Sequence, residues 1–325
     1  MRTLLVLAAA ALLAVACVTG TAGVRSSSMT ETAPHTVPAE PPIQSGPGRF
    51  ELPPPLREPV AAPGDVAEPV PGGTVDWGRK VVRARGTGVV DPGNQNLAQA
   101  RLMAERAAVV VAQRNLLEIV KGVRVDSDTK VENFMTKFDV VYSHVDGVVR
   151  GARQVGPAVY DEGSGTVEVE LEIDLTGPQS VAGALSPALG TGQPVSTGQL
   201  SPQVQEFFRQ YSGLVLEAGN SGLKPSLFPK IYDESGNLLL DTRNYFQELT
   251  GQTGITAVQY VERLDQILSR PEFSRNPLVL KVKQVTGRLG TDIILSRPDA
   301  DKLKWLKDGA KYLLDAGRLL VRLLL

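Results

Sequence analysis

The chain has little of the residue types on which most metal sites and nucleophilic active sites depend. Its 325 residues include one cysteine and two histidines, and only 5% are aromatic. A single cysteine excludes a disulfide within one chain, and two histidines leave little material for a zinc site or an imidazole catalyst. We therefore expect a protein that is not an enzyme and that has no cofactor and no metal.

The chain also lacks an excess of charge of either sign. Its 34 lysines and arginines are balanced by 35 acidic residues, which gives a formal net charge of -1. Proteins that bind nucleic acid carry clustered positive charge, so we expect no nucleic-acid partner. The length corresponds to about two domains.

Residues 1–16 have the pattern of a signal peptide. Arg2 precedes the apolar run from Leu4 to Ala16, which is too short to span a bilayer. The run ends Ala-Val-Ala before Cys17, and this resembles the lipobox of bacterial lipoproteins, whose cysteine thiol receives diacylglycerol. Ordinary signal-peptidase cleavage is the alternative, but the one cysteine lies where acylation requires it. We expect Cys17 to be acylated, and Val18 after it favours the outer membrane by the same resemblance.

Two stretches are rich in proline and glycine and predict disordered linkers. The first, residues 17–75, contains twelve of the 23 prolines, between Pro34 and Pro71. Such a sequence cannot bury a core, and proline holds it extended at about 3.1 Å per residue. The second linker covers residues 178–202. The folded parts are then residues 76–177 and residues 203–325.

Residues 76–177 predict a small α+β domain. A strand near residues 80–88 precedes Asn96, a helix N-cap, and the helix ends at Gly122. The predicted core stripe of this helix contains alanines that allow close approach to a sheet: Ala100, Met103, Ala104, Ala107, Val110, Val111 and Leu117. Extended stretches follow at 123–126, 134–141 and 147–155. Together with the strictly alternating strand 166–175, they predict a long helix packed on a three- or four-stranded antiparallel sheet.

Residues 203–325 predict a second α+β domain. Strands are expected at 213–218, 278–285, 291–295 and 318–325, with a hairpin over 227–240. Residues 255–268 have the pattern of an amphipathic helix, and a further helix begins after Ser296.

Three polar patterns are candidate sites. Acidic residues alternate along the strand 166–175 (Glu168, Glu170, Glu172 and Asp174) and either bind a basic partner or cations, or pair with Arg150 and Arg153 on a solvated face. Asp126 to Lys130 begins like a calcium loop, but Lys130 occupies a ligand position, so a polar turn is expected.

The third pattern is the glycine-rich connection Gly219–Pro225. Lys224 and the backbone amides of this loop can receive an anion, or the loop is a rigid connection between strands. With Glu217 and Asp233 nearby in sequence, it supports an alternative function, that of a periplasmic ligand-binding or hydrolytic protein with its site near residues 217–233.

Four successive segments of the first domain resemble a known family. These are Asn115–Ser127, Thr129–Phe134, Gly147–Ala152 and the alternating strand up to Leu175. The pattern looks like the Lpp-twenty-like lipoprotein family, which includes the flagellar lipoprotein FlgP and is similar to the amino-terminal domain of FlgT. The resemblance covers residues 76–177 and implies a small α+β domain, outer-membrane lipidation and a role in envelope or flagellar assembly. It supplies no catalytic residue.

These observations predict a non-catalytic exported lipoprotein, anchored to the outer membrane through Cys17, with its folded domains in the periplasm or at the cell surface. It would act as a structural or partner-binding component of the cell envelope. Its expected partners are membrane lipid, envelope proteins and a second copy of itself through a strand edge. Lys224, Glu217 and Arg150 are the candidate contact residues.

Overall fold

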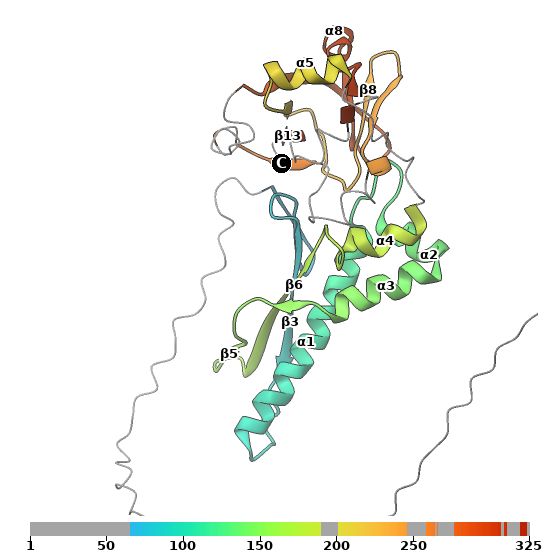
Figure 1. The fold of residues 1–325 in the computed structure, drawn as a ribbon. Helices are drawn as coiled ribbons and strands as arrows, with labels where there is room; N and C mark the ends of the chain where they lie inside the picture. Colours follow the sequence, from blue (N-terminus) through green and yellow to red (C-terminus); the bar gives the residue numbers. More distant parts are fainter. Residues whose placement is uncertain are drawn as a thin grey trace, which may run out of the picture. The chain divides into compact units, whose positions relative to one another are not determined.

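The structure is a computed structural model, and it describes residues 66–189, 201–245, 258–263, 265, 276–306, 309–310 and 319–323. These residues form an α+β protein, as the sequence predicts (Figure 1). We call residues 66–189 the N-terminal region and residues 201–323 the C-terminal region. Cys17 and the signal peptide lie outside the described residues. None of the described helices combines the length and the apolar character that crossing a membrane requires.

The N-terminal region contains a six-stranded sheet in which every pairing is antiparallel. Its strands are β1 (Ala67–Val70), β2 (Gly73–Asp76), β3 (Val81–Val89), β4 (Arg153–Gln154), β5 (Val159–Asp161) and β6 (Thr166–Asp174), and its helices are α1 (Leu97–Gly122), α2 (Val131–Lys137), α3 (Asp139–Arg150) and α4 (Val181–Leu189). The order is β1-β2-β3-β6, and both β4 and β5 pair with the far edge of β6. The prediction of three or four strands was too low. The hairpin β1–β2 lies largely within residues 17–75, which the sequence assigned to the first linker, and β4 and β5 are too short to show a pattern.

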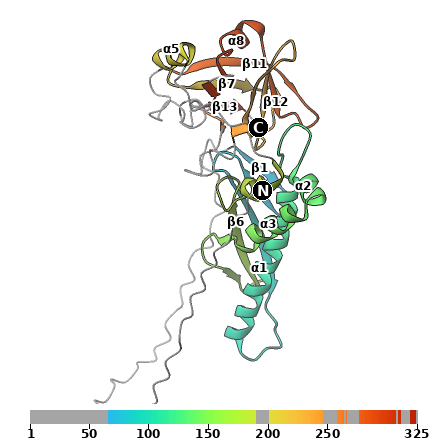
Figure 2. The ribbon, with the colours of Figure 1, turned by 45° about the vertical axis from the view of Figure 1, so that its right-hand side comes forward.

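Helix α1 packs along β3 and β6, as predicted (Figures 1 and 2). Its N-cap is Asn96, whose side chain accepts a hydrogen bond from the backbone N–H of Gln99 at 3.1 Å. The helix and β3 are in backbone contact. A Cβ added at Gly86 or Gly88 would lie 2.1 Å from the carbonyl oxygen of Ala108 or 1.9 Å from that of Ala104. Only glycine fits at these two positions of β3.

The buried stripe of α1 differs from the predicted one. It consists of small residues at a spacing of four, followed by larger ones near the C-terminal end: Ala100, Ala104, Ala108, Ala112, Leu116, Ile119 and Val120. Met103 and Val110, which were predicted to be core residues, are exposed. The two glycines of β3 leave room for methyl groups only, so the helix turns its longer side chains away from the sheet.

The predicted extended stretches 134–141 and 147–155 were mostly wrong, because residues 131–150 form helices α2 and α3 and only β4 remains a strand. The many valines of this segment favour a strand locally. However, Val141, Val145 and Val149 are buried while Ser143 and Gly147 are exposed. In a strand all five residues would share one face, whereas a helix can turn only every fourth residue to the core. The packing of these valines in the core therefore outweighs the local preference of valine for a strand.

Both edges of the N-terminal sheet are interrupted. The backbone N–H of Trp77 donates to the carbonyl of Val66, so Ala67 and Pro69 face away from β2 at the open edge. Pro69 has no N–H to offer there. On the other side, Gly156, which has a φ of +76°, and Pro157 separate β4 from β5. Neither edge presents a continuous ladder of donors and acceptors.

The C-terminal region contains a seven-stranded mixed sheet in the order β10-β13-β7-β11-β12-β8-β9 (Figure 2). Its elements are α5 (Pro202–Gln210), β7 (Leu214–Gly219), β8 (Lys230–Asp233), β9 (Leu238–Asp241), the 3-10 helix η1 (Thr242–Tyr245), β10 (Gln259–Val261), β11 (Leu278–Thr286), β12 (Asp292–Leu295), α8 (Arg297–Asp301) and β13 (Leu319–Leu323). The four predicted strands, the hairpin and the helix start after Ser296 are confirmed. The helix predicted over 255–268 was wrong at Gln259–Val261, which form β10 parallel to β13, and most of the rest lies outside the described residues.

One hydrophobic core runs through both regions and includes Val120, Val123 and Val125 of the first and Leu227, Phe228 and Leu240 of the second. The loop after α1 carries the backbone contacts. Leu227 N donates to the carbonyl of Arg124 at 3.0 Å, Phe228 N to that of Val125 at 2.8 Å, and Leu289 N to that of Ser127 at 2.9 Å. Helix α4, which lies within the predicted linker 178–202, is itself partly buried.

Candidate functional site

A pocket of about 310 Å³ lies between the hairpin β1–β2 and the C-terminal end of α1. Apolar and aromatic side chains form most of its wall, together with three charged residues: Glu68, Val70, Pro71, Val75, Trp77, Glu118, Ile119, Gly122, Val123 and Arg124. A concave, mostly apolar pocket with a few converging polar groups is the usual form of a binding site. We therefore take it as the candidate site.

Three elements bring its polar residues together. Glu68 lies on β1 opposite Val75, Trp77 follows the last residue of β2, and Arg124 comes two residues after the end of α1. The guanidinium of Arg124 binds both carboxylate oxygens of Glu68, with Nη1 donating to Oε1 at 3.1 Å, and Nε1 of Trp77 donates to Oε2 at 3.3 Å. The carboxylate is thus held from two sides.

The electrostatic state of Glu68 follows from these contacts. Burial on its own would raise the pKa of the Glu68 carboxyl, but the hydrogen bonds and charge of Arg124, with the Trp77 hydrogen bond and the charge of Lys224, outweigh burial and lower that pKa. A carboxylate that stays ionised and is already bound by two donors is a poor general acid or base. The arrangement suits recognition better than proton transfer.

Arg124 also joins the pocket to the C-terminal region. Its Nε donates to the carbonyl of Pro225 at 2.7 Å, and its guanidinium carbon lies 5.5 Å from the centre of the Trp77 ring. The Trp77 ring in turn meets Tyr260 edge-on, with 6.1 Å between the ring centres. The pocket is therefore supported from behind by residues of both regions.

The sequence-predicted contact residues are placed as follows. Lys224 is exposed, and its charge acts on Glu68, so the Gly219–Pro225 loop approaches the candidate pocket. The loop is also bound to its surroundings, because Lys224 N donates to the carbonyl of Gly290 at 2.8 Å. Glu217 is bound by Arg322 of β13, with both of its oxygens 2.8 Å from Nη1.

Arg150 and Asp233 stand apart from the pocket lining. Arg150, at the end of α3, pairs with Asp146 at 2.8 Å. Asp233 accepts hydrogen bonds from Ser235 and Asn237 within the β8–β9 turn, and these bonds lower its pKa. Neither residue lines the candidate pocket.

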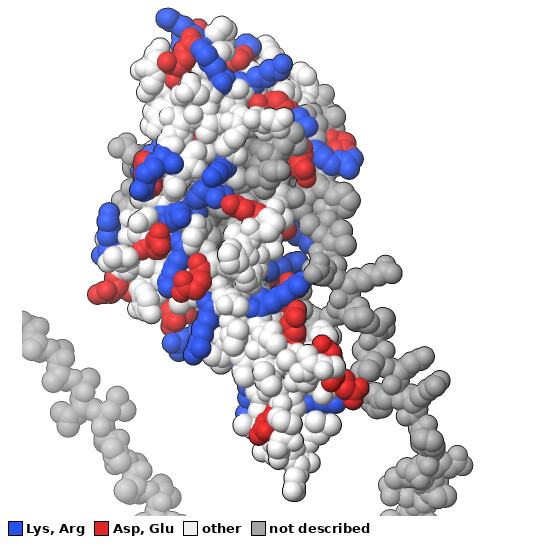
Figure 3. All heavy atoms as spheres, turned by 180° about the vertical axis from the view of Figure 1, so that it is seen from behind, with Lys and Arg blue, Asp and Glu red and all other residues white. Residues whose placement is uncertain are grey.

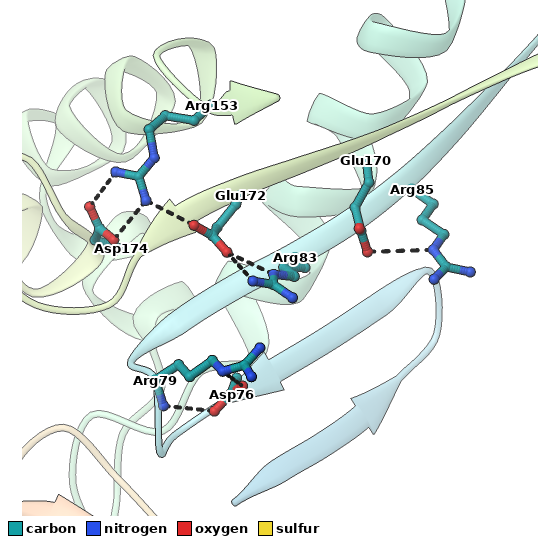
Figure 4. A network of polar contacts seen from close by, with 8 residues as sticks. All are labelled: Asp76, Arg79, Arg83, Arg85, Arg153, Glu170, Glu172 and Asp174. Carbon is teal, nitrogen blue, oxygen red and sulfur yellow. Dashed lines mark hydrogen bonds and ion pairs between the residues drawn. The ribbon is translucent and has the colours of Figure 1, made fainter. Parts of the chain in front are cut away.

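The acidic stripe of β6 lies opposite arginines (Figure 4). Glu172 is bound by Arg83 of β3, at 2.6 Å, and by Arg153 of β4, at 2.8 Å, and Arg153 also holds Asp174 at 2.9 Å. Arg85 lies 3.5 Å from Glu170 and 3.7 Å from Glu168. The pairing is confirmed with Arg153, although the side chains of Glu172 and Glu170 are mostly covered, at 14% and 18% exposed. The predicted pairing with Arg150 was wrong, because Arg150 pairs with Asp146 of its own helix. Acidic and basic side chains also lie side by side over the face in Figure 3.

Asp126 forms the polar turn that the sequence predicts. Its Oδ1 accepts hydrogen bonds from the backbone N–H groups of Asp128, at 3.0 Å, and Thr129, at 2.9 Å, and from the Thr129 hydroxyl at 2.7 Å. The other oxygen, Oδ2, lies 3.7 Å from Nη1 of Arg243. Over the part of the chain that the structure describes, no cluster of three or more acidic, histidine or cysteine side chains is suited to a metal ion.

Residues 213–322 match a known family model. The family is described as the second domain of Treponema pallidum Tp0624, and the match covers about a third of the chain. It spans the C-terminal sheet from β7 into β13 and includes Glu217 and Lys224, whereas Glu68, Trp77 and Arg124 lie outside it. No curated protein matches the chain.

The three polar residues of the pocket were not found from the sequence. Glu68 stands between Ala67 and Pro69 in a proline-rich stretch, where no strand pattern is visible. Trp77 gave the one usable signal, because a large aromatic residue directly after such a stretch marks the start of a core.

Proposed function

We propose that this protein is an exported lipoprotein, acylated at Cys17 and anchored to the outer membrane, whose folded part lies in the periplasm or at the cell surface. It acts there as a non-catalytic structural or partner-binding component of the cell envelope, in flagellar or other envelope assembly. The resemblance of residues 76–177 to the Lpp-twenty-like lipoproteins supports this proposal.

The observation that carries the proposal is the position of the single cysteine. Cys17 directly follows an apolar leader that ends in small residues, and this is the position that lipoprotein processing requires. Two or three acyl chains, at about 0.8 kcal/mol per buried methylene, give a stable anchor.

Metabolic labelling with palmitate tests the anchor. We expect label in the wild-type protein, found in the outer-membrane fraction, and neither label nor membrane retention in Cys17→Ala. A mature wild-type product with an unmodified thiol, recovered from the soluble periplasmic fraction, would disprove the proposal.

The partner-binding role is supported by the satisfied polar groups of the pocket. Glu68, Arg124 and the Trp77 N–H bind one another, so the pocket offers a partner mainly apolar surface. Burial of such surface yields roughly 25 cal/mol per Å². This is enough to hold an apolar side chain of a partner segment.

Filling the pocket tests this role. A Cβ added at Gly122, which lines the pocket, meets no atom within 4 Å, so Gly122→Leu places an apolar side chain at the wall of the pocket from an unobstructed position. We expect it to reduce capture of crosslinked partners from cells by about tenfold, the effect of losing one well-buried anchor. Gly147 of α3 is equally unobstructed, so Gly147→Leu is the matched control. Equal capture by both variants would exclude the pocket as the partner site.

A further inference from the structure

One face of α1 exposes large apolar side chains. The helix packs on β3 and β6 through its alanine stripe, and it also contacts α2 and α3, where Gln113 donates to the carbonyl of Arg150 at 3.5 Å. On the opposite face, Leu102 is 60% exposed, Met103 59% and Val110 47%. Large apolar side chains that are grouped and exposed in this way usually mark an interaction surface.

Between Leu97 and Arg114 the charges on this face are of one sign. At 3.6 residues per turn, Arg106 and Arg114 fall on the same exposed arc as Met103, Ala107 and Val110. Between Leu97 and Arg114 the one acidic residue is Glu105, which lies toward the sheet side and is half-buried. The exposed face is therefore apolar and cationic at the same time.

We propose that this face of α1 docks on an anionic phospholipid bilayer. Leu102, Met103 and Val110 would enter the interface between headgroups and acyl chains, while the two arginines bind lipid phosphates. This combination is the one by which amphipathic helices lie on membranes.

The proposal rests on the lipid anchor proposed above, which keeps the chain beside a membrane. The length of the predicted first linker allows the contact. From its sequence, a proline-rich chain from Cys17 to Val66 could reach on the order of 100 Å at about 3.1 Å per residue, which is enough for the N-terminal region to return to the bilayer.

Vesicle sedimentation tests the docking with the mature chain that carries Cys17→Ala, so that no acyl group contributes. We expect binding to vesicles of phosphatidylglycerol and phosphatidylcholine, and at least about tenfold weaker binding to phosphatidylcholine alone. Val110→Glu should lower binding to the anionic vesicles about tenfold, and Arg106→Gln and Arg114→Gln about fivefold each. Val140 of α3 is 46% exposed, so Val140→Glu is the matched control and should bind as the parent does.

Three results would overturn the docking. The first is an absence of binding to anionic vesicles, and the second is an equal loss of vesicle binding in Val110→Glu and Val140→Glu. The third is self-association in solution that Val110→Glu abolishes, because this result would assign the face to a second copy of the chain. Circular dichroism and thermal melting of each variant show whether it is folded. Because the protein in this test has no lipid, a failure here is distinct from a failure of palmitate labelling at Cys17.

Discussion

At the scale of single residues, the pair of Glu68 and Arg124 determines the character of the candidate pocket. Arg124 is nearly buried, and its guanidinium contacts the Glu68 carboxylate, the Pro225 carbonyl and the face of Trp77. A buried arginine that lost its carboxylate would retain an uncompensated charge. The pair therefore fixes the loop after α1 in place.

Glu68→Gln should make the protein less stable at neutral pH by about 2 kcal/mol, the value of hydrogen bonds to a charged group. The pKa of Glu68 is lowered from 4.5 in the folded state, so its contribution is present above that pH and is lost as the pH falls through the lower folded value. The variant should show a flatter decline of stability in acid, measured by urea unfolding across pH.

Glu118→Gln is the control for this measurement, because Glu118 also lines the pocket but pairs with Lys121 at the surface, with a side chain that is 70% exposed. It should change the stability by no more than about 0.5 kcal/mol. If Glu118→Gln and Glu68→Gln behaved alike, the buried pair would have no special part in holding the loop.

At the scale of elements, the contact of α1 with β3 shows which features of the helix could be predicted from the sequence and which could not. The Asn96 cap, the helix length and the alternation of β6 are local signals, and all are confirmed. The rotation of α1 about its axis is not local, because it depends on Gly86 and Gly88 of a neighbouring strand. Likewise, the helical state of the valine-rich α3 depends on what Val141 and Val145 pack against.

Gly88→Ala should destabilise the protein by about 3 kcal/mol, because its Cβ would lie 1.9 Å from the carbonyl oxygen of Ala104 and the helix would have to move. Thermal and chemical unfolding measure the change. Gly147→Ala, inside α3 with nothing within 4 Å, is the control and should instead stabilise by up to about 1 kcal/mol. A Gly88→Ala protein as stable as wild type would contradict the backbone contact.

At the scale of the whole molecule, the core of the two regions is continuous. The sequence placed a linker at residues 178–202 and gave no sign that the loop after α1 bonds to residues 225–228 and 289, which are about a hundred or more positions away. Backbone hydrogen bonds between residues so far apart in the sequence leave no pattern of side chains from which they could be predicted. The glycine-rich turn Gly287–Gly290 is the one visible trace of this junction.

Gly287→Ala should weaken the junction. The residue has a φ of +88°, and its added Cβ would lie 2.3 Å from Cβ of Ser127. Gly236 has a φ of +83° with nothing within 4 Å, so Gly236→Ala has the same backbone strain without the clash. We expect Gly287→Ala to lose about 2 kcal/mol more than Gly236→Ala in urea unfolding. Equal losses would mean that the turn does not press on Ser127.

The interrupted edges of the N-terminal sheet matter when many copies of the protein lie close together. Pro69 interrupts the edge at β1, and Gly156 and Pro157 interrupt the edge formed by β4 and β5. Proteins confined to a surface meet each other far more often than in solution, and exposed strands would then template one another into fibres. For a protein held at a membrane by the anchor proposed above, the two interrupted borders therefore disfavour polymerisation through this sheet. An assembly of several copies would then form through side-chain contacts more readily than through continued β-pairing of this sheet.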